Sequence, residues 1–348
     1  SNLFVKLVSI WAGLIEMLGY YLDNHARECN VMTARLYPSM VKHAFSADYR
    51  LKAYRAATTN VVFNLSTVSS SDITIPTGLE LTTSAGITFR ILAGGTIPAG
   101  ELSITLTAAQ ITTRISMATL GVSSGMPNQV FEIPSINAAD MSIAITIDGI
   151  AWEASDTLGY ASGDSPHFLQ TVNINGKPVI VFGDGINGKI PPVGSDIFIS
   201  YNTTEAASGN IGANTLVNIT TAPPLPSGVT LTATNPYAAS GGAPLETIEE
   251  LRYKIPKSIR TLHRAVSAAD YIDMAELASG VAKAGFEYSC ESYVQIYIVP
   301  EGGGVASTAL LNSTSQWLSD KVMIVPPYTV IAAGEVVLNF ILNIRVNS

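Results

Sequence analysis

The chain has 348 residues, which is long enough for two or three domains that each bury a core. Hydrophobic residues make up 47%, charged residues only 13%, and the mean hydropathy is +0.31, so the composition excludes a largely disordered chain. The net charge of −8 disfavours nucleic acid as a partner, because phosphate contacts need clustered Lys and Arg. An exterior with so few charges suits a protein that neighbouring chains cover in part.

The first segment predicts an amphipathic helix, because apolar residues from Leu3 to Leu22 recur in steps of three and four. Phe4, Val8 and Ile15 lie beside the main apolar stripe. The stripe itself is Leu3, Leu7, Trp11, Leu14, Leu18 and Leu22. The opposite, more polar stripe is Lys6, Ser9, Gly13, Glu16, Tyr20 and Asp23.

Two interpretations of this helix stay open. It is either an ordinary domain helix or a helix that bundles with another chain, and the strand-rich sequence after it leaves it little helical company. Lys6 and Glu16 interrupt the apolar run, and Tyr20–Asp23 lacks the small residues of a signal-peptide cleavage site. We therefore expect neither an export signal nor membrane insertion. Pro38 then predicts the start of a shorter helix towards Phe45.

From about residue 60 to 235 the sequence predicts an antiparallel β region. Leu102–Leu106 alternates between apolar and polar residues, as strands with one buried face do. The region could divide near Met126-Pro127 or after Asp156. The segment Thr221–Pro226 contains three prolines and cannot be a central strand, since proline donates nothing to a ladder.

Short turns separate these strands. Three Pro-x-Gly sequences predict type I turns with proline second and glycine fourth. They begin at Pro76, Pro98 and Pro192. Four dipeptides that tolerate positive φ predict hairpin turns. They are Asp148-Gly149, Asn175-Gly176, Asp184-Gly185 and Asn187-Gly188.

Two short capped helices follow. Thr247 with Glu250 forms one capping box and Ser267 with Asp270 a second. Pro256 is expected to end or kink the first helix, and Gly280 to close the second. A strand over Tyr293–Val299, a helix over Thr308–Lys321 and an alternating strand over Val336–Val346 then predict a small α+β domain of which this sequence holds only a part.

The fold class expected is therefore α+β with several domains. The expected divisions are an N-terminal helical segment (1–58), an antiparallel β region with one or two subdomains (59–235), a helix pair (236–285) and a partial, ferredoxin-like ring-forming domain (286–348).

With these segments in view, the chain resembles the baseplate J-like family, the wedge proteins of contractile phage tails and related injection machines. The likeness covers nearly the whole chain, and the order and spacing of the motifs are more specific than any one of them. The matching segments are Phe182–Gly188, Gly209–Ala213, Asn235-Pro236, Gly241-Gly242, Glu246–Arg252, Arg264–Ser267, Asp270-Tyr271, Gly280–Ala284 and, upstream, Tyr20–Asp23 and Thr33–Arg35. Ser267 stands where the family usually has threonine, and Thr203–Glu205 replaces a glycine-rich loop.

The resemblance implies a structural baseplate wedge subunit without enzymatic activity. It implies that two copies pair with another wedge protein through N-terminal helices, that a ring closes around the hub, and that ring rearrangement triggers sheath contraction. Hub, sheath-end and fibre-attachment proteins are further implied partners. The implied location is the virion tail baseplate, assembled in the host bacterial cytoplasm.

The residues themselves indicate no reactive centre. The four histidines, His25, His43, His167 and His263, are scattered and have no carboxylate or cysteine at metal-ligand spacing. Cys29 and Cys290 are the only cysteines, which is too few for a thiolate zinc site or a disulfide framework, and a reducing compartment is expected. We expect no metal, cofactor or catalytic residues.

Two other functions stay open. One is a β-rich adhesin or carbohydrate-binding domain of a tail fibre, for which Trp152, Tyr160 and Tyr237 are the candidate aromatic platforms. The other is an enzyme that cuts cell wall or capsule, which only the β-rich composition favours.

Overall fold

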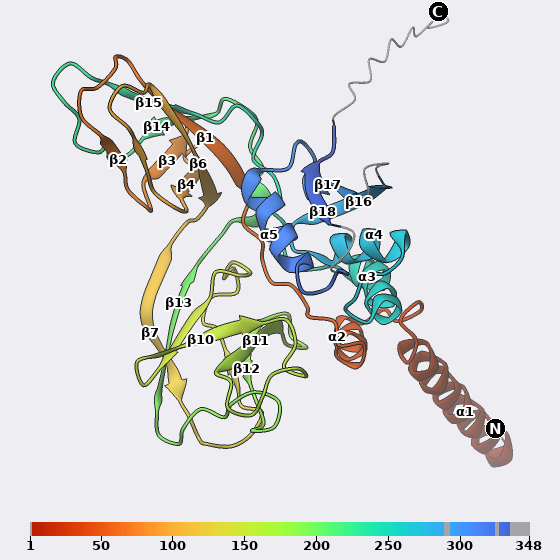
Figure 1. Cartoon of the computed structure of the whole chain (residues 1–348). Helices are drawn as coiled ribbons and strands as arrows, with labels where there is room; N and C mark the ends of the chain where they lie inside the picture. Colours follow the sequence, from red (N-terminus) through yellow and green to blue (C-terminus); the bar gives the residue numbers. More distant parts are fainter. Residues whose placement is uncertain (1, 289–292, 324–326, 335–348) are drawn as a thin grey trace, which may run out of the picture.

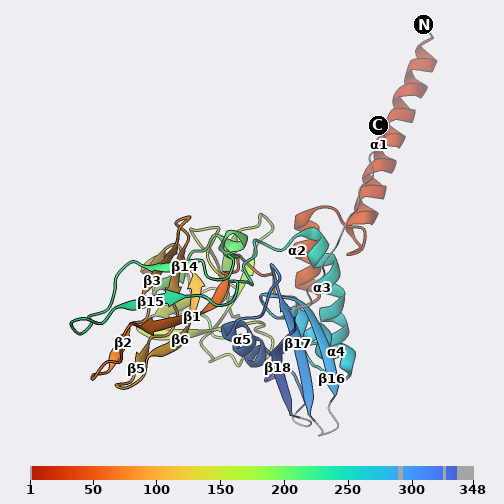
Figure 2. The ribbon, with the colours of Figure 1, turned by 90° about the horizontal axis from the view of Figure 1, so that it is seen from above.

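The computed structural model describes residues 2–288, 293–323 and 327–334, and it is an α+β protein. Two β bodies and one helical body meet at the centre, and a long helix projects from the helical body (Figures 1 and 2). The helices in this part of the chain are α1 (Leu3–Glu28), α2 (Tyr37–Ser46), α3 (Ile248–Thr261), α4 (Ala268–Leu277) and α5 (Thr308–Leu318).

The first β body is a six-stranded sheet with a separate two-stranded ribbon. The sheet order is β14-β3-β4-β6-β1-β15, and the ribbon pairs β2 with β5. Phe63 and Phe89 are fully buried between them. The strands are β1 (Thr58–Leu65), β2 (Ile73–Ile75), β3 (Glu80–Thr83), β4 (Thr88–Ile91), β5 (Gly95–Ile97), β6 (Ser103–Gln110), β14 (Leu216–Ile219) and β15 (Leu231–Thr234).

The second β body is a seven-stranded sheet in the order β7-β13-β9-β10-β11-β12-β8, and we call it the module. Its strands are β7 (Arg114–Val122), β8 (Val130–Glu132), β9 (Ala144–Ile147), β10 (Ile150–Ser155), β11 (His167–Val172), β12 (Pro178–Phe182) and β13 (Asp196–Asn202). The module is inserted between β6 and β14 of the first body, so the chain passes from one sheet to the other near residues 111–113 and 203–205. Neither Met126-Pro127 nor Asp156 is such a crossing point.

The β region is not entirely antiparallel. β10 and β11 pair in parallel, with Glu153 opposite His167, while the other pairs in both β bodies are antiparallel. The long connection between Ser155 and His167 is the physical reason, because a parallel pair needs a crossover that a tight turn cannot supply.

The Pro-x-Gly turns differ by one position from the expected type. The amides of Leu79, Glu101 and Ser195 donate to the carbonyls of Pro76, Pro98 and Pro192 at 3.3, 3.1 and 3.3 Å. Proline is therefore the first residue of each turn and glycine the third. The three glycines have φ of 82°, 95° and 80°, which the third position of a type II turn requires and glycine adopts without strain.

Of the four hairpin dipeptides, Asp148-Gly149 is confirmed as a two-residue turn. Both residues have positive φ, and Ile147 faces Ile150 across the turn between β9 and β10. Asn175-Gly176 lies in a longer loop between β11 and β12. The other two dipeptides lie in segment 183–195 between β12 and β13, which are not neighbours in the sheet, so the expected central hairpin there is wrong.

The helical body contains α2 to α5 and the sheet β16-β17-β18, whose strands are β16 (Val281–Tyr288), β17 (Val294–Pro300) and β18 (Tyr328–Ala332). α4 packs against β16 and β17, and α3 packs against α2 and α4. β17 and β18 are direct parallel neighbours, whereas a ferredoxin-like split βαβ unit leaves room for a strand between them. The ferredoxin-like expectation is not confirmed. The strand predicted over Val336–Val346 lies outside the described residues, and the domain boundaries stay predictions.

The local helix signals largely hold. Both capping boxes form, with Thr247 and Ser267 accepting from the amides of Glu250 and Asp270. Pro256 does not end α3, which continues to Thr261. α4 ends at Leu277, before Gly280, so that glycine is not its cap.

A buried ionic cluster ties the helical body to segment 48–57, which joins α2 to β1 and which we call the strap. Glu246 accepts hydrogen bonds from the Tyr49 hydroxyl at 2.6 Å, the Lys254 ammonium at 2.9 Å and the Lys52 amide at 3.0 Å. Arg55 pairs with Glu301 at 2.8 Å. Removing one partner of such a cluster leaves a buried charge unpaired, so the strap is held firmly against α3.

Candidate protein-interaction surface

α1 is the most exposed element of the described structure. It has 26 residues, which corresponds to a length of about 39 Å. The Asn2 side chain caps it by accepting from the Phe4 amide at 3.2 Å. None of its residues is buried, and it points away from every other element (Figures 1 and 2).

Hydrogen bonds at its C-terminal end fix the direction of α1. The Glu28 carboxylate accepts from the amides of Arg35 and Leu36 at 2.9 and 3.2 Å. The Glu28 carbonyl lies 2.8 Å from Nε2 of His43 in α2. Hydrogen bonds from the Ser39 side chain and the Arg35 amide lower the pKa of Glu28. The base of α1 is therefore attached to α2, while the rest of the helix is free of intramolecular contacts that would bury it.

The six predicted interface residues all lie on α1, and the structure leaves all of them uncovered. They are Leu3, Leu7, Trp11, Leu14, Leu18 and Leu22, and their exposed fractions run from 48% for Leu7 to 72% for Leu3. Leu and Trp side chains inside a protein core are nearly inaccessible to water. A contiguous apolar surface of this size marks a site that another molecule covers. The identity of that molecule stays a prediction.

The apolar surface of α1 is wider than the predicted stripe. Ile10, Met17 and Tyr21 are exposed on the same side, next to Leu3 and Leu14. At 100° per residue, the apolar arc covers roughly 200° of the helix circumference. Placing every residue of the segment on a helical wheel would have shown this from the sequence, whereas following two stripes did not.

α1 is also the one helix in the described part of the chain that is long and apolar enough to cross a membrane by length and composition. The mean hydropathy over its best 18-residue window is 1.5. A signal sequence passes the same test, and so does the core helix of a soluble protein. The absence of membrane insertion therefore stays a prediction.

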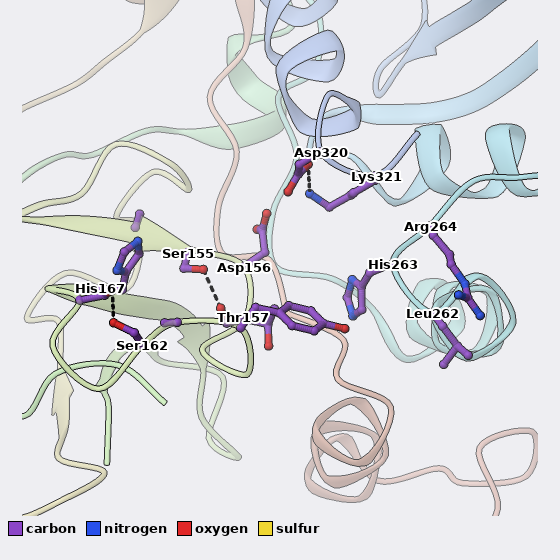
Figure 3. A pocket seen from close by; sticks show the side chains of 14 residues that line it. Ser155, Asp156, Thr157, Ser162, His167, Leu262, His263, Arg264, Asp320 and Lys321 are labelled. Atoms are coloured by element: carbon purple, nitrogen blue, oxygen red, sulfur yellow. Dashed lines mark hydrogen bonds and ion pairs between the residues drawn. The ribbon is translucent and has the colours of Figure 1, made fainter. Parts of the chain in front are cut away.

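A second surface feature is a polar cleft of about 840 Å³ between the module and the helical body. Figure 3 shows its two sides. The module contributes Ser155, Asp156, Thr157, Ser162 and His167, and the helical body contributes Leu262, His263, Arg264, Asp320 and Lys321.

The cleft shows no arrangement typical of nucleophilic catalysis. Nε2 of His167 lies 3.6 Å from Glu153, and Nε2 of His263 lies 3.3 Å from a carboxylate oxygen of Asp48. In the described part of the chain, no serine or threonine hydroxyl is hydrogen-bonded to a histidine, which a nucleophile–base pair requires. Among the same residues, no three His, Cys, Asp or Glu side chains gather to hold a metal ion.

The aromatic candidates for a carbohydrate platform do not lie together on one surface. Trp152 is only 6% exposed, and its ring packs edge-to-face on Phe182 with centroids 5.1 Å apart. The expectation that Trp152 is an exposed platform is wrong, because the module's sheet encloses it in its core. Tyr160 and Tyr237 are exposed, but they belong to different β bodies.

Comparison with known proteins gave one kind of match. No family model matches the chain, and no curated protein matches it. Among solved structures, the chain is similar to a chain in the 6-fold symmetrised cryo-EM structure of the anti-feeding prophage baseplate. The match covers 95% of this chain and 67% of that chain at 14% sequence identity, with a TM-score of 0.29. That TM-score is too low to establish a shared fold.

Proposed function

We propose that this chain is a structural subunit of a contractile-tail baseplate and that it joins its partners through α1. The observation that carries the proposal is a 26-residue helix with no buried residue and with its large apolar side chains exposed to water. The baseplate identity comes from the sequence motifs that resemble wedge proteins. The structural neighbour is a baseplate chain as well, and the likeness extends no further than that coarse description.

The width of the apolar arc favours a bundle over a simple pair. One partner helix covers only the narrow seam of a two-stranded coiled coil. An arc of roughly 200° needs neighbours on two sides. This agrees with the resemblance, which implies a second copy of the chain and one further wedge protein around the N-terminal helices. Ring formation around the hub and release of the sheath belong to the same proposal.

The proposal excludes a reactive site as the source of function. A ring that changes its diameter needs interfaces with two stable arrangements, and residues that pack and repack supply them. The described residues offer no metal cluster and no nucleophile paired with a base. Assembly is therefore the function that the exposed surfaces support best.

The test is co-purification of the chain with the wedge protein encoded beside it. Trp11→Ala and Leu14→Ala each remove large apolar side chains from the arc, and each should weaken the complex by about 2–5 kcal/mol if the seam is fully buried. The matched control is Glu16→Ala on the polar side of the same helix, which should leave recovery of the partner unchanged. Recovery at the wild-type level with both arc variants would contradict the proposal.

A further inference from the structure

The module is joined to the first β body through two adjacent segments. The Thr112 amide donates to the Thr203 carbonyl at 2.9 Å, and the Thr203 amide donates to the Thr113 carbonyl at 2.8 Å. The two crossing segments therefore lie side by side, and Figure 1 shows the long strands β7 and β13 continuing from them into the module. A few residues at the ends of paired elements are the usual place of a hinge.

A second attachment holds the module against the helical body. Nη1 and Nη2 of Arg50, in the strap, donate to the two carboxylate oxygens of Asp140 at 2.8 and 3.2 Å. Nε of Arg50 donates to Asp156 at 2.8 Å. The side chains of Arg50 and Asp140 are 6% and 1% exposed. Ser279, just after α4, also donates to Asp140, at 3.1 Å. All five guanidinium hydrogens face a planar, charge-matched site that belongs to the module.

Apolar contact across this boundary is small. The module has its own core around Trp152 and Phe182. Val172 is the only module residue in the buried core cluster of the helical body. The polar cleft of about 840 Å³ and a second cleft of about 380 Å³, lined by Arg50 and Asp140 among others, open at the same boundary. Bodies that meet through such a polar, incomplete interface move relative to one another by default.

We propose that the Arg50–Asp140–Asp156 cluster is a latch and that the module swings about the hinge at residues 111–113 and 203–205 when the latch opens. Both hydrogen-bonded sheets stay intact in this motion. Only the Arg50 ion pairs, the Ser279 contact, the bond from the Asp140 amide to the Tyr54 carbonyl and the seat of Val172 are lost. The inference rests on the module's attachments and is independent of the role proposed for α1.

The first test measures the distance between spin labels on the module and the helical body. Ile150 and Ile259 are exposed, one on each body, and accept the labels as cysteines in a Cys29→Ser, Cys290→Ser background. The latch is removed without leaving a buried charge by combining Arg50→Met, Asp140→Asn and Asp156→Asn. The expected result is a distance distribution that broadens and gains a separate population.

The matched control is Arg90→Met, which removes an ion pair with Glu80 inside the six-stranded sheet and should leave the distances unchanged. An unchanged distribution in a folded latch variant would overturn the inference.

The second test uses the unaltered chain, so it decides the matter even if the latch variant does not fold. The Asp140 amide donates to the Tyr54 carbonyl at 2.6 Å across the boundary. A hinged module exposes this amide without unfolding, so it should exchange its hydrogen at least roughly tenfold faster than amides in the β11–β12 ladder. Exchange of both at the same rate would show that the boundary opens only with global unfolding, and the inference would fail.

Discussion

Lys52 and Glu246 lie in one buried cluster and respond to it in different ways. Burial would raise the pKa of Glu246, but the charges of Lys254, Lys52 and Arg55 outweigh burial and lower that pKa to about 2. Burial lowers the pKa of Lys52 to about 7, and the nearby charge of Lys254 acts in the same direction. Lys52 is thus poorly placed to carry a charge at neutral pH.

The pKa of Lys52 makes a prediction about stability. Between about pH 7 and pH 9 the unfolded chain keeps this proton while the folded chain loses it, so the free energy of unfolding should rise with pH by up to about 2 kcal/mol. The increase is measured by urea denaturation at a series of pH values. Lys52→Met should abolish it, and Lys177→Met, which changes an exposed lysine, should not. A wild-type profile that is flat over this range would refute the assignment.

Trp152 makes a second prediction at this scale. Because its ring is buried against Phe182, Trp152→Ala should destabilise the chain by about 3–5 kcal/mol. Tyr160→Ala, at a side chain that is 82% exposed, should change stability by less than about 0.5 kcal/mol. Chemical denaturation of both variants measures the difference, and similar small effects would contradict the packing described here.

Sequence reasoning about single residues succeeded where the cause was local and failed where it was tertiary. The caps Thr247 and Ser267 were predictable, because each bonds an amide three residues away. The burial of Trp152 was not, because it depends on how β10 lies against β12 in a closed sheet. The ionic cluster around Glu246 joins residues nearly two hundred positions apart and had no sequence signal.

At the scale of elements, α3 shows how packing overrides propensity. Proline inside a helix costs about 3 kcal/mol, because it removes a hydrogen bond and its ring crowds the preceding turn. Leu251 and Ile255 before Pro256 and Thr261 after it are nonetheless buried in the helical body. Their burial holds both halves in one helix, which the sequence pattern could not show.

The capping box of α3 offers a test of element stability. Thr247→Ala removes the side-chain acceptor for the Glu250 amide and should cost about 1 kcal/mol in thermal or chemical unfolding. Thr247→Ser keeps the hydroxyl and should restore the wild-type value. Equal stability of the alanine and serine variants would show that the cap contributes nothing.

α1 leads to the opposite expectation. Deleting residues 1–24 removes most of a helix that buries nothing within the chain, so the unfolding free energy should stay within about 0.5 kcal/mol of the full chain. The deletion should also improve solubility, because the largest exposed apolar surface is gone. A loss of thermal stability would mean that α1 packs on its own chain. The periodicity of this segment predicted the helix, but only the structure showed that no intramolecular partner covers it.

At the scale of the whole molecule, the three bodies differ in how firmly they are joined. The strap and α3 share a buried ionic cluster, and α5 contacts β1 through hydrogen bonds from Thr58 to Ser307 and from Asn60 to Thr308. The module meets the helical body through the Arg50 latch and Val172. α1 stands outside all of them. The sequence predicted the α+β class and the order of elements, but not the insertion of one sheet into another, since that depends on pairing between distant strands.

The central claim is that partner chains cover the apolar arc of α1 in the assembled particle. Photo-crosslinking in cells that assemble the particle tests it most directly, with benzoylphenylalanine placed at Leu14 in the arc and, as a control, at Glu16 on the polar side. The account predicts a polypeptide adduct from position 14 and little or none from position 16. No adduct from position 14, equal adducts from both, or adducts with lipid alone would contradict it.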